Sequence, residues 1–135
     1  MNVAFFLTPK SEVAWVPVGA TMRQAIERME AHRYTAVPLL DEDGRYVGTL
    51  TEGDLLWMMK RTPGLTFEAT EYVRLSEVPR RMQNKPVQID AEVEQLLSLA
   101  ADQNFVPVVD SRDVFIGIVR RKAIIEHCAN LLGQR

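Results

Sequence analysis

Apolar and polar residues in the first half of the chain predict alternating strands and helices. A short apolar stretch at 14–18 is followed by apolar residues at helical spacing over 22–29. Two largely apolar runs at 35–40 and 46–50 flank a polar turn, which is typical of a hairpin. A further helix is expected at about 52–61. The predicted order is strand, helix, two strands and a closing helix.

The second half of the chain predicts the same order of elements. An extended segment at 87–89 precedes helical spacing over 93–100, and two apolar runs at 105–109 and 114–119 flank another polar turn. A closing helix is expected at about 121–132. The chain is therefore predicted to hold two β-α-β-β-α copies in an α/β fold.

The residues repeat as well as the pattern. The segment VPLLD at 37–41 returns as VPVVD at 106–110, and VGTL at 47–50 returns as IGIV at 116–119, both 69 positions later. A copy of about 55 residues is only marginally stable alone. We therefore expect the two copies to pack sheet to sheet as one pseudo-symmetric module.

The expected organisation has three parts. Residues 1–61 hold the first copy, residues 62–86 form a linker and lead-in, and residues 87–135 hold the second copy. Pro63 and Gly64 end the first closing helix, because both residues interrupt helices. Apolar residues of the linker predict a short helical turn before the second copy.

Composition excludes several classes of function. The 16 basic and 18 acidic residues give a net charge of −2, which argues against binding to nucleic acid. No apolar run is long enough for a membrane helix, and no signal peptide is visible, so a cytoplasmic protein is expected. One cysteine and two histidines supply neither a disulfide framework nor a metal site, and no catalytic set of residues stands out.

The repeated segments, at 36–41 with Gly44 and 47–56, and again at 105–110 and 116–119, resemble the CBS domain. The whole chain resembles a tandem CBS protein, or Bateman module, of the small stand-alone bacterial type. That resemblance implies a non-enzymatic regulatory module that binds an adenosine-containing nucleotide such as AMP, ADP or ATP in clefts between the repeats. It also implies a paired, disc-shaped homodimer.

Gly48, Thr51 and Asp54 resemble the ribose and phosphate motif of that family. The motif lies where a strand is expected to give way to a helix, whose free N–H groups attract phosphate. The threonine hydroxyl is expected to bind a phosphate oxygen and the carboxylate to accept a ribose diol. The alternative is a capping box, because Thr-x-x-Asp also starts helices without any ligand.

The second copy departs from this motif. Arg120 stands where the first copy has Thr51, and Ala123 stands where it has Asp54. Arg120 and Arg121 at a helix start are unfavourable for the helix dipole unless they meet a phosphate, so both are candidate ligand residues. The alternative is that they extend into water or pair with acids of a partner subunit.

Four further residues are implied by the resemblance as walls for an adenine ring: Ala14, Tyr34, Thr35 and Ala36. The alternative for each of them is an ordinary strand edge without a ligand. The Tyr-Thr-Ala segment and the arginine pair are similar to those of CBS proteins that bind cyclic di-AMP, whereas Asp54 fits a mononucleotide better. Two alternatives to an AMP, ADP or ATP sensor therefore stay open. One is a cyclic di-AMP sensor, and the other is a ligand-free interaction and dimerisation module.

The helix expected at 52–61 contains five consecutive apolar residues, LLWMM at 55–59. Five consecutive positions cover most of a helix circumference, so this helix must be covered on more than one side. Leu56 and Trp57 are expected to face water in a monomer and to lie at or near the dimer interface. The alternative is that residues 1–10 or the linker around Phe67 cover Trp57 within one chain. A downstream protein partner is expected but not identified.

Overall fold

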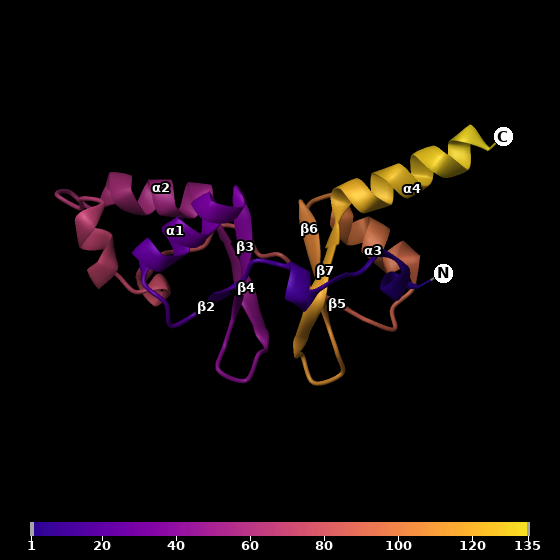
Figure 1. Cartoon of the computed structure of the whole chain (residues 1–135), viewed down its shortest axis with the longest axis horizontal. Helices are drawn as coiled ribbons and strands as arrows, with labels where there is room; N and C mark the ends of the chain where they lie inside the picture. The colour runs from indigo at the N-terminus through magenta and orange to yellow at the C-terminus, as the bar shows by residue number, and fades with distance from the viewer. Residues whose placement is uncertain (1, 135) are drawn as a thin grey trace. The chain divides into compact units, whose positions relative to one another are not determined.

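The computed structural model describes residues 2–134, and these residues form two compact units (Figure 1). One unit consists of residues 14–83, and the other combines residues 2–13 with residues 84–134. Each unit contains the order β-α-β-β-α that the sequence predicts, so the mixed α/β fold with two related copies is confirmed. Within residues 2–134, no helix is both long enough and apolar enough to span a membrane.

The unit of residues 14–83 has one sheet with strand order β2-β3-β4. Strand β2 runs parallel to β3, and β3 runs antiparallel to β4. Both helices lie on the same side of β3 and β4 in Figure 1. The elements are β2 (Val16–Pro17), α1 (Met22–His32), β3 (Ala36–Leu40), β4 (Tyr46–Thr51), α2 (Glu52–Arg61) and the 3-10 turns η3 (Glu68–Tyr72) and η4 (Leu75–Glu77).

Local chemistry explains where these elements begin and turn. Thr21 and Gln24 form a capping box at the start of α1, with the Thr21 hydroxyl oxygen accepting the Gln24 N–H at 3.2 Å. The hairpin turn between β3 and β4 uses Gly44 at φ 78°, a conformation that glycine adopts readily. The core beneath the helices contains side chains with no exposed surface, including Met22, Leu39 and Leu50.

The other unit has a four-stranded sheet with order β1-β7-β6-β5. Its core includes Leu96, Val106 and Val119, none of which has exposed surface. The elements are η1 (Val3–Phe6), β1 (Thr8–Pro9), η2 (Lys10–Glu12), β5 (Val87–Gln88), α3 (Val93–Ala100), β6 (Phe105–Val109), β7 (Phe115–Arg120) and α4 (Arg121–Gly133).

Strand β1 is an addition that the sequence patterns do not predict. It pairs antiparallel with β7, placing Thr8 opposite Ile118 and Pro9 opposite Gly117. Residues 2–13 therefore belong to the compact unit that contains the second copy. Gly117 permits this pairing, because a Cβ at that position would overlap the carbonyl oxygen of Thr8.

Another difference concerns the strand expected at 14–18. The observed strand β2 covers only Val16 and Pro17, and Ala14 precedes it. Proline has no N–H to donate, which limits the ladder at that point. Hydrogen bonding continues one residue beyond β2, where the Val18 N–H donates to the Leu40 carbonyl at 2.8 Å.

Candidate functional site

The Gly48–Asp54 motif lies at the junction of β4 and α2, as the sequence predicts. Thr51 is the N-cap of α2, and its hydroxyl oxygen accepts the N–H of Asp54 at 3.1 Å. In return, Oδ2 of Asp54 accepts the N–H of Thr51 at 3.0 Å. The capping box that the sequence left open as an alternative is therefore present. It leaves the Thr51 hydroxyl hydrogen as a possible donor to a ligand.

The second oxygen of Asp54 holds the linker. Oδ1 accepts the backbone N–H of Arg81 at 3.1 Å, from a residue 27 positions further along the chain. Asp54 is only 2% exposed, and both carboxylate oxygens accept backbone hydrogen bonds within the unit. The carboxylate expected to accept a ribose diol thus has a demonstrable role in the fold, joining the start of α2 to the linker.

Two linker arginines, which the sequence reasoning did not single out, lie at this motif. A Cβ built on Gly48 would be 2.8 Å from Nε of Arg80 and 3.1 Å from its Cζ, so the guanidinium lies directly against the Gly48 backbone. The guanidinium of Arg81 lies over the Trp57 ring, 4.8 Å from its centroid. Nothing in the local pattern around residues 80 and 81 indicates these contacts, because they depend on the course of the linker.

The charge of Arg80 also influences the half-buried phenol of Tyr46 in β4. The Tyr46 hydroxyl and the Thr49 hydroxyl oxygen are 2.6 Å apart, and Thr49 has no exposed surface. Burial raises the pKa of Tyr46 above its usual 10.0, while the Thr49 hydrogen bond and the positive charge of Arg80 partly lower it. The Arg80 charge therefore lies close enough to Tyr46 to favour the ionised phenol.

Strand pairing brings part of the Tyr34–Ala36 segment to the motif. Ala36 lies directly opposite Thr51 in the β3–β4 ladder, and the carbonyl of Thr35 accepts the N–H of Glu52 at 3.0 Å. The Tyr34 side chain instead lines a groove of about 480 Å³ formed mainly by α1 and α2. The backbone of residues 35 and 36 is thus the part of the segment closest to Thr51.

Ala14, the remaining residue predicted for this copy, is 4% exposed and precedes β2. The strand that follows it pairs with β3, which separates it in the sheet from β4 and its Thr51. The structure therefore brings together Thr35, Ala36, Thr51 and Asp54 but gives Ala14 no strand contact with them.

The two arginines of the second copy have different surroundings. Arg120 is the exposed N-cap residue of α4. Nε of Arg121 donates to the carbonyl of Ala100 at 3.0 Å and to that of Gln103 at 3.1 Å. Arg121 therefore caps the C-terminal end of α3, where helix carbonyls lack intrahelical partners. The sequence reasoning missed this structural role.

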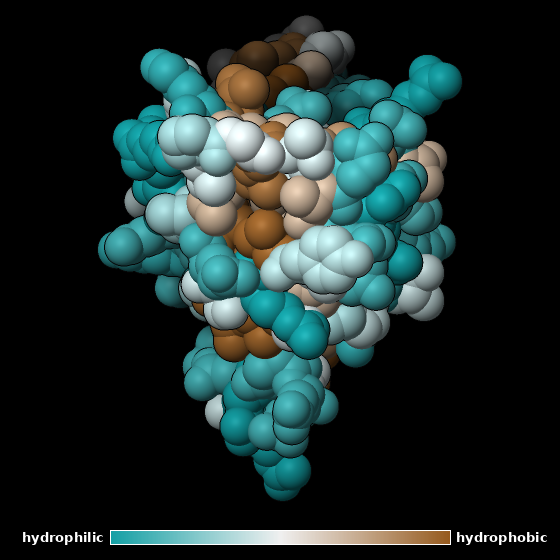
Figure 2. Space-filling view, turned by 90° about the vertical axis from the view of Figure 1, so that its left-hand side faces the viewer, coloured by the Kyte–Doolittle hydropathy of each residue, from teal (hydrophilic) through white to brown (hydrophobic). Residues whose placement is uncertain are grey.

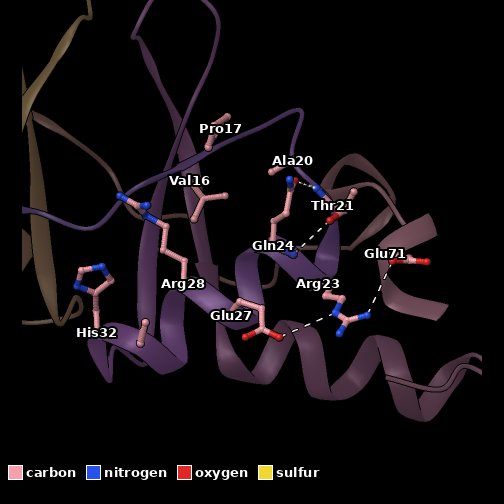
Figure 3. A pocket seen from close by; sticks show the side chains of 11 residues that line it. Val16, Pro17, Ala20, Thr21, Arg23, Gln24, Glu27, Arg28, His32 and Glu71 are labelled. Carbon is pink, nitrogen blue, oxygen red and sulfur yellow. Dashed lines mark hydrogen bonds and ion pairs between the residues drawn. The ribbon is translucent and has the colours of Figure 1, made fainter. Parts of the chain in front are cut away.

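A separate groove of about 770 Å³ lies between α1 and β2 (Figure 3). Arg23 on its wall is 3.9 Å from Glu27 and 3.8 Å from Glu71, and the Thr21–Gln24 capping box forms another part of the lining. Figure 3 shows Arg28 projecting from the same helix away from these pairs. Because most of its polar groups already bind one another, this groove is a weaker candidate than the motif.

The outer side of α2 corrects one expectation. Leu56 is 60% exposed, as the sequence predicts, but Trp57 is half-buried beneath the guanidinium of Arg81. The expectation that Trp57 faces water was wrong because a linker cation covers its ring.

Figure 2 looks onto the side that carries α1 and α2 and shows an apolar strip between hydrophilic side chains.

Metal binding finds no support in this part of the chain. Among residues 2–134, no three His, Cys, Asp or Glu side chains are grouped so that they could hold a metal ion.

Comparison with known proteins identifies the repeated unit. The family model of the CBS domain matches residues 6–61 and 75–130. The protein named Cyclic di-AMP receptor B of Bacillus subtilis (strain 168) is 26% identical over 130 residues, which cover 93% of this chain and 84% of that protein.

Solved structures share the fold. CbpB of Listeria monocytogenes in complex with c-di-AMP matches with a TM-score of 0.83 at 22% identity, covering 98% of this chain and 98% of that one. CBSX2 in complex with AMP matches with a TM-score of 0.74 at 23% identity, covering 99% of this chain and 98% of that one.

Proposed function

The chain belongs to the CBS domain family, and we propose that it is a regulatory module that binds an adenosine-containing nucleotide without catalysing a reaction. The observation that carries the proposal is the junction of β4 and α2 in the first repeat. There Thr51 caps a ten-residue helix, with Ala36 directly opposite and the Thr35 carbonyl bonded to Glu52. A helix N-terminus with a hydroxyl donor suits a phosphate group, and a neighbouring strand start suits a base.

The ligand is proposed to be AMP, ADP or ATP, with cyclic di-AMP as the second candidate. The second candidate is favoured by the Bacillus subtilis relative, which is named as a cyclic di-AMP receptor. Arg120, exposed at the start of α4, is the residue of the second repeat that we propose for a phosphate contact. Arg121 is proposed to support it while capping α3. Adenine nucleotides and cyclic di-AMP are cytoplasmic metabolites, and a cytoplasmic location is part of this proposal.

Calorimetric titration of the purified protein with adenosine, AMP, ATP and cyclic di-AMP tests the function. We expect at least one nucleotide to bind with micromolar affinity or better. We also expect affinity to fall as salt rises, since contacts between phosphate and exposed arginines are screened. GTP serves as the control for the base. Absence of binding by all four adenine compounds would leave the ligand-free interaction module as the function.

We also propose that the protein is a homodimer that docks through its exposed helix faces and passes the signal to a protein partner. Leu56 of α2 is 60% exposed, and Ile125 and Leu132 of α4 are 58% and 63% exposed. Apolar side chains exposed to this extent favour association. Light scattering at micromolar concentration should give about twice the chain mass of 15.3 kDa. Leu56→Glu should shift the protein toward the monomer, whereas Glu52→Gln on the same helix should not.

A further inference from the structure

We infer, resting on the proposed function, that Arg80 of the linker is the phosphate-binding residue of the first-repeat site. This residue lies outside the repeated motif, and it would make the site discriminate phosphorylated adenosine compounds from adenosine itself.

The Arg80 guanidinium lies against the backbone of Gly48. Its Nε lies 2.8 Å from where a Gly48 Cβ would be, so the guanidinium occupies the space that the missing side chain leaves. Gly48 is three residues before Thr51, the N-cap of α2, and we propose that its hydroxyl and the helix N-terminus bind the phosphate. The guanidinium also acts electrostatically on Tyr46 in the same strand. The cation thus lies against β4 three residues before the strand gives way to α2, where we propose that the phosphate binds.

Within residues 2–134, the Arg80 guanidinium has no internal counterion. Among residues 2–134, no ion pair or hydrogen bond engages the Arg80 side chain, whereas Arg23 and Arg45 are ion-paired within the same unit. A guanidinium presents a planar fork of donors that matches phosphate oxygens, and such contacts are stronger than neutral hydrogen bonds. Arg80 is therefore available to an anion that arrives from solvent.

The part of the linker that carries Arg80 is held in place by Arg81. The N–H of Arg81 donates to the buried carboxylate of Asp54, and the Arg81 side chain lies over Trp57. These two contacts fix the backbone next to Arg80 and so restrict where its guanidinium can reach. A positioned arginine loses less conformational entropy on binding than an unrestrained one.

The two repeats differ at this position, which assigns the cation to the first one. At Gly117, the counterpart of Gly48, the neighbour is the backbone of Thr8 in β1 rather than a side-chain cation. Ala123 stands at the counterpart of Asp54, so the second repeat has no carboxylate at that place. An Arg80-type contact is a property of the first repeat alone.

The test is Arg80→Gln, titrated with AMP, ATP, cyclic di-AMP and adenosine at two salt concentrations. We expect the affinity for the nucleotide that the wild type binds to fall about tenfold or more, and that for adenosine to change by less than about twofold. The dependence of nucleotide affinity on salt should also weaken. Arg80→Lys keeps the positive charge but lacks the planar pair of donors, so its nucleotide affinity should lie between those of the wild type and Arg80→Gln. Arg28→Gln, which removes an equal charge from α1, is the matched control.

The outcomes separate this inference from the proposed function. If the wild type binds no adenine compound, the proposed function fails and the inference falls with it. If the wild type binds a nucleotide but Arg80→Gln binds it equally well with the same salt dependence, only the inference is overturned. Equal losses for adenosine and nucleotide would also overturn it, because they would indicate a packing role. Where adenosine binds too weakly to measure, the salt dependence decides.

Discussion

Replacing Gly117 by alanine should destabilise the protein by about 3 kcal/mol, near the upper end of the usual cost of overpacking. The new Cβ would overlap the carbonyl oxygen of Thr8 and crowd the Leu7 side chain. Thr8 is part of β1, and its backbone is paired with Ile118, so it cannot move away without breaking the ladder. The free energy of unfolding from urea denaturation measures the loss.

Gly48→Ala is the matched comparison, because Gly48 has the same place in the first repeat. The two glycines have φ of 158° and 159°, so any backbone cost of the alanine is common to both variants. At Gly48 the Cβ would meet only the end of the flexible Arg80 side chain. We expect a loss of stability at least about 1 kcal/mol smaller than at Gly117. Gly19→Ala, with no atom within 4 Å of the new Cβ, is the neutral control. Equal losses at Gly48 and Gly117 would contradict the steric explanation.

Elements with a local cause could be predicted from the sequence. Helix α2 and strand β6 have the predicted bounds, Glu52–Arg61 and Phe105–Val109, because periodicity and capping residues specify them within a few positions. Strand β1 could not be predicted in this way. It consists of two residues, Thr8–Pro9, whose partners lie more than a hundred positions away, and so short a segment has no periodicity.

In the candidate site, too, the contacts between residues close in sequence could be predicted, and those between distant residues could not. Thr51 and Asp54 are three positions apart, so the sequence indicated both the capping box and the ligand motif at once. The contacts made by Arg121 and by the Arg81 backbone join residues 18 to 27 positions apart. Their partners or donors are backbone groups, which every residue carries. Residue type alone therefore does not predict these contacts. The contact between Arg80 and Gly48 could not be predicted either, because it depends on the path of the linker.

Replacing Asp54 by alanine is the second change for which we expect a large loss of stability. Asp54→Ala removes the acceptor for the N–H groups of Thr51 and Arg81 at a place where the residue is 2% exposed. Hydrogen bonds to charged groups contribute roughly 1.5–3 kcal/mol each, and the water that could replace the carboxylate recovers part of this. We expect the free energy of unfolding to fall by about 3 kcal/mol. Asp43→Ala, which removes an exposed carboxylate from the hairpin turn, should cost far less.

The same variant distinguishes two ways in which Asp54 can serve nucleotide binding. We expect Asp54→Ala to weaken the affinity for AMP about tenfold or more, equivalent to about 1.4 kcal/mol. If the carboxylate contacts the ribose, adenosine should lose as much affinity as AMP. If it acts by holding the linker, AMP should lose more than adenosine, because Arg80 is displaced. Calorimetry below the unfolding transition measures both affinities.

The fluorescence of Trp57 without nucleotide reports directly whether the linker has moved. In a Trp15→Phe background, Trp57 is the only tryptophan, and its ring lies beneath the Arg81 guanidinium. Releasing the linker should remove this cation and change the Trp57 emission before any nucleotide is added. Asp54→Asn keeps one oxygen acceptor and should produce a smaller change in the same direction. An unchanged emission spectrum together with equal losses for AMP and adenosine would indicate a direct ribose contact, because the linker would then have kept its place over Trp57 without the carboxylate.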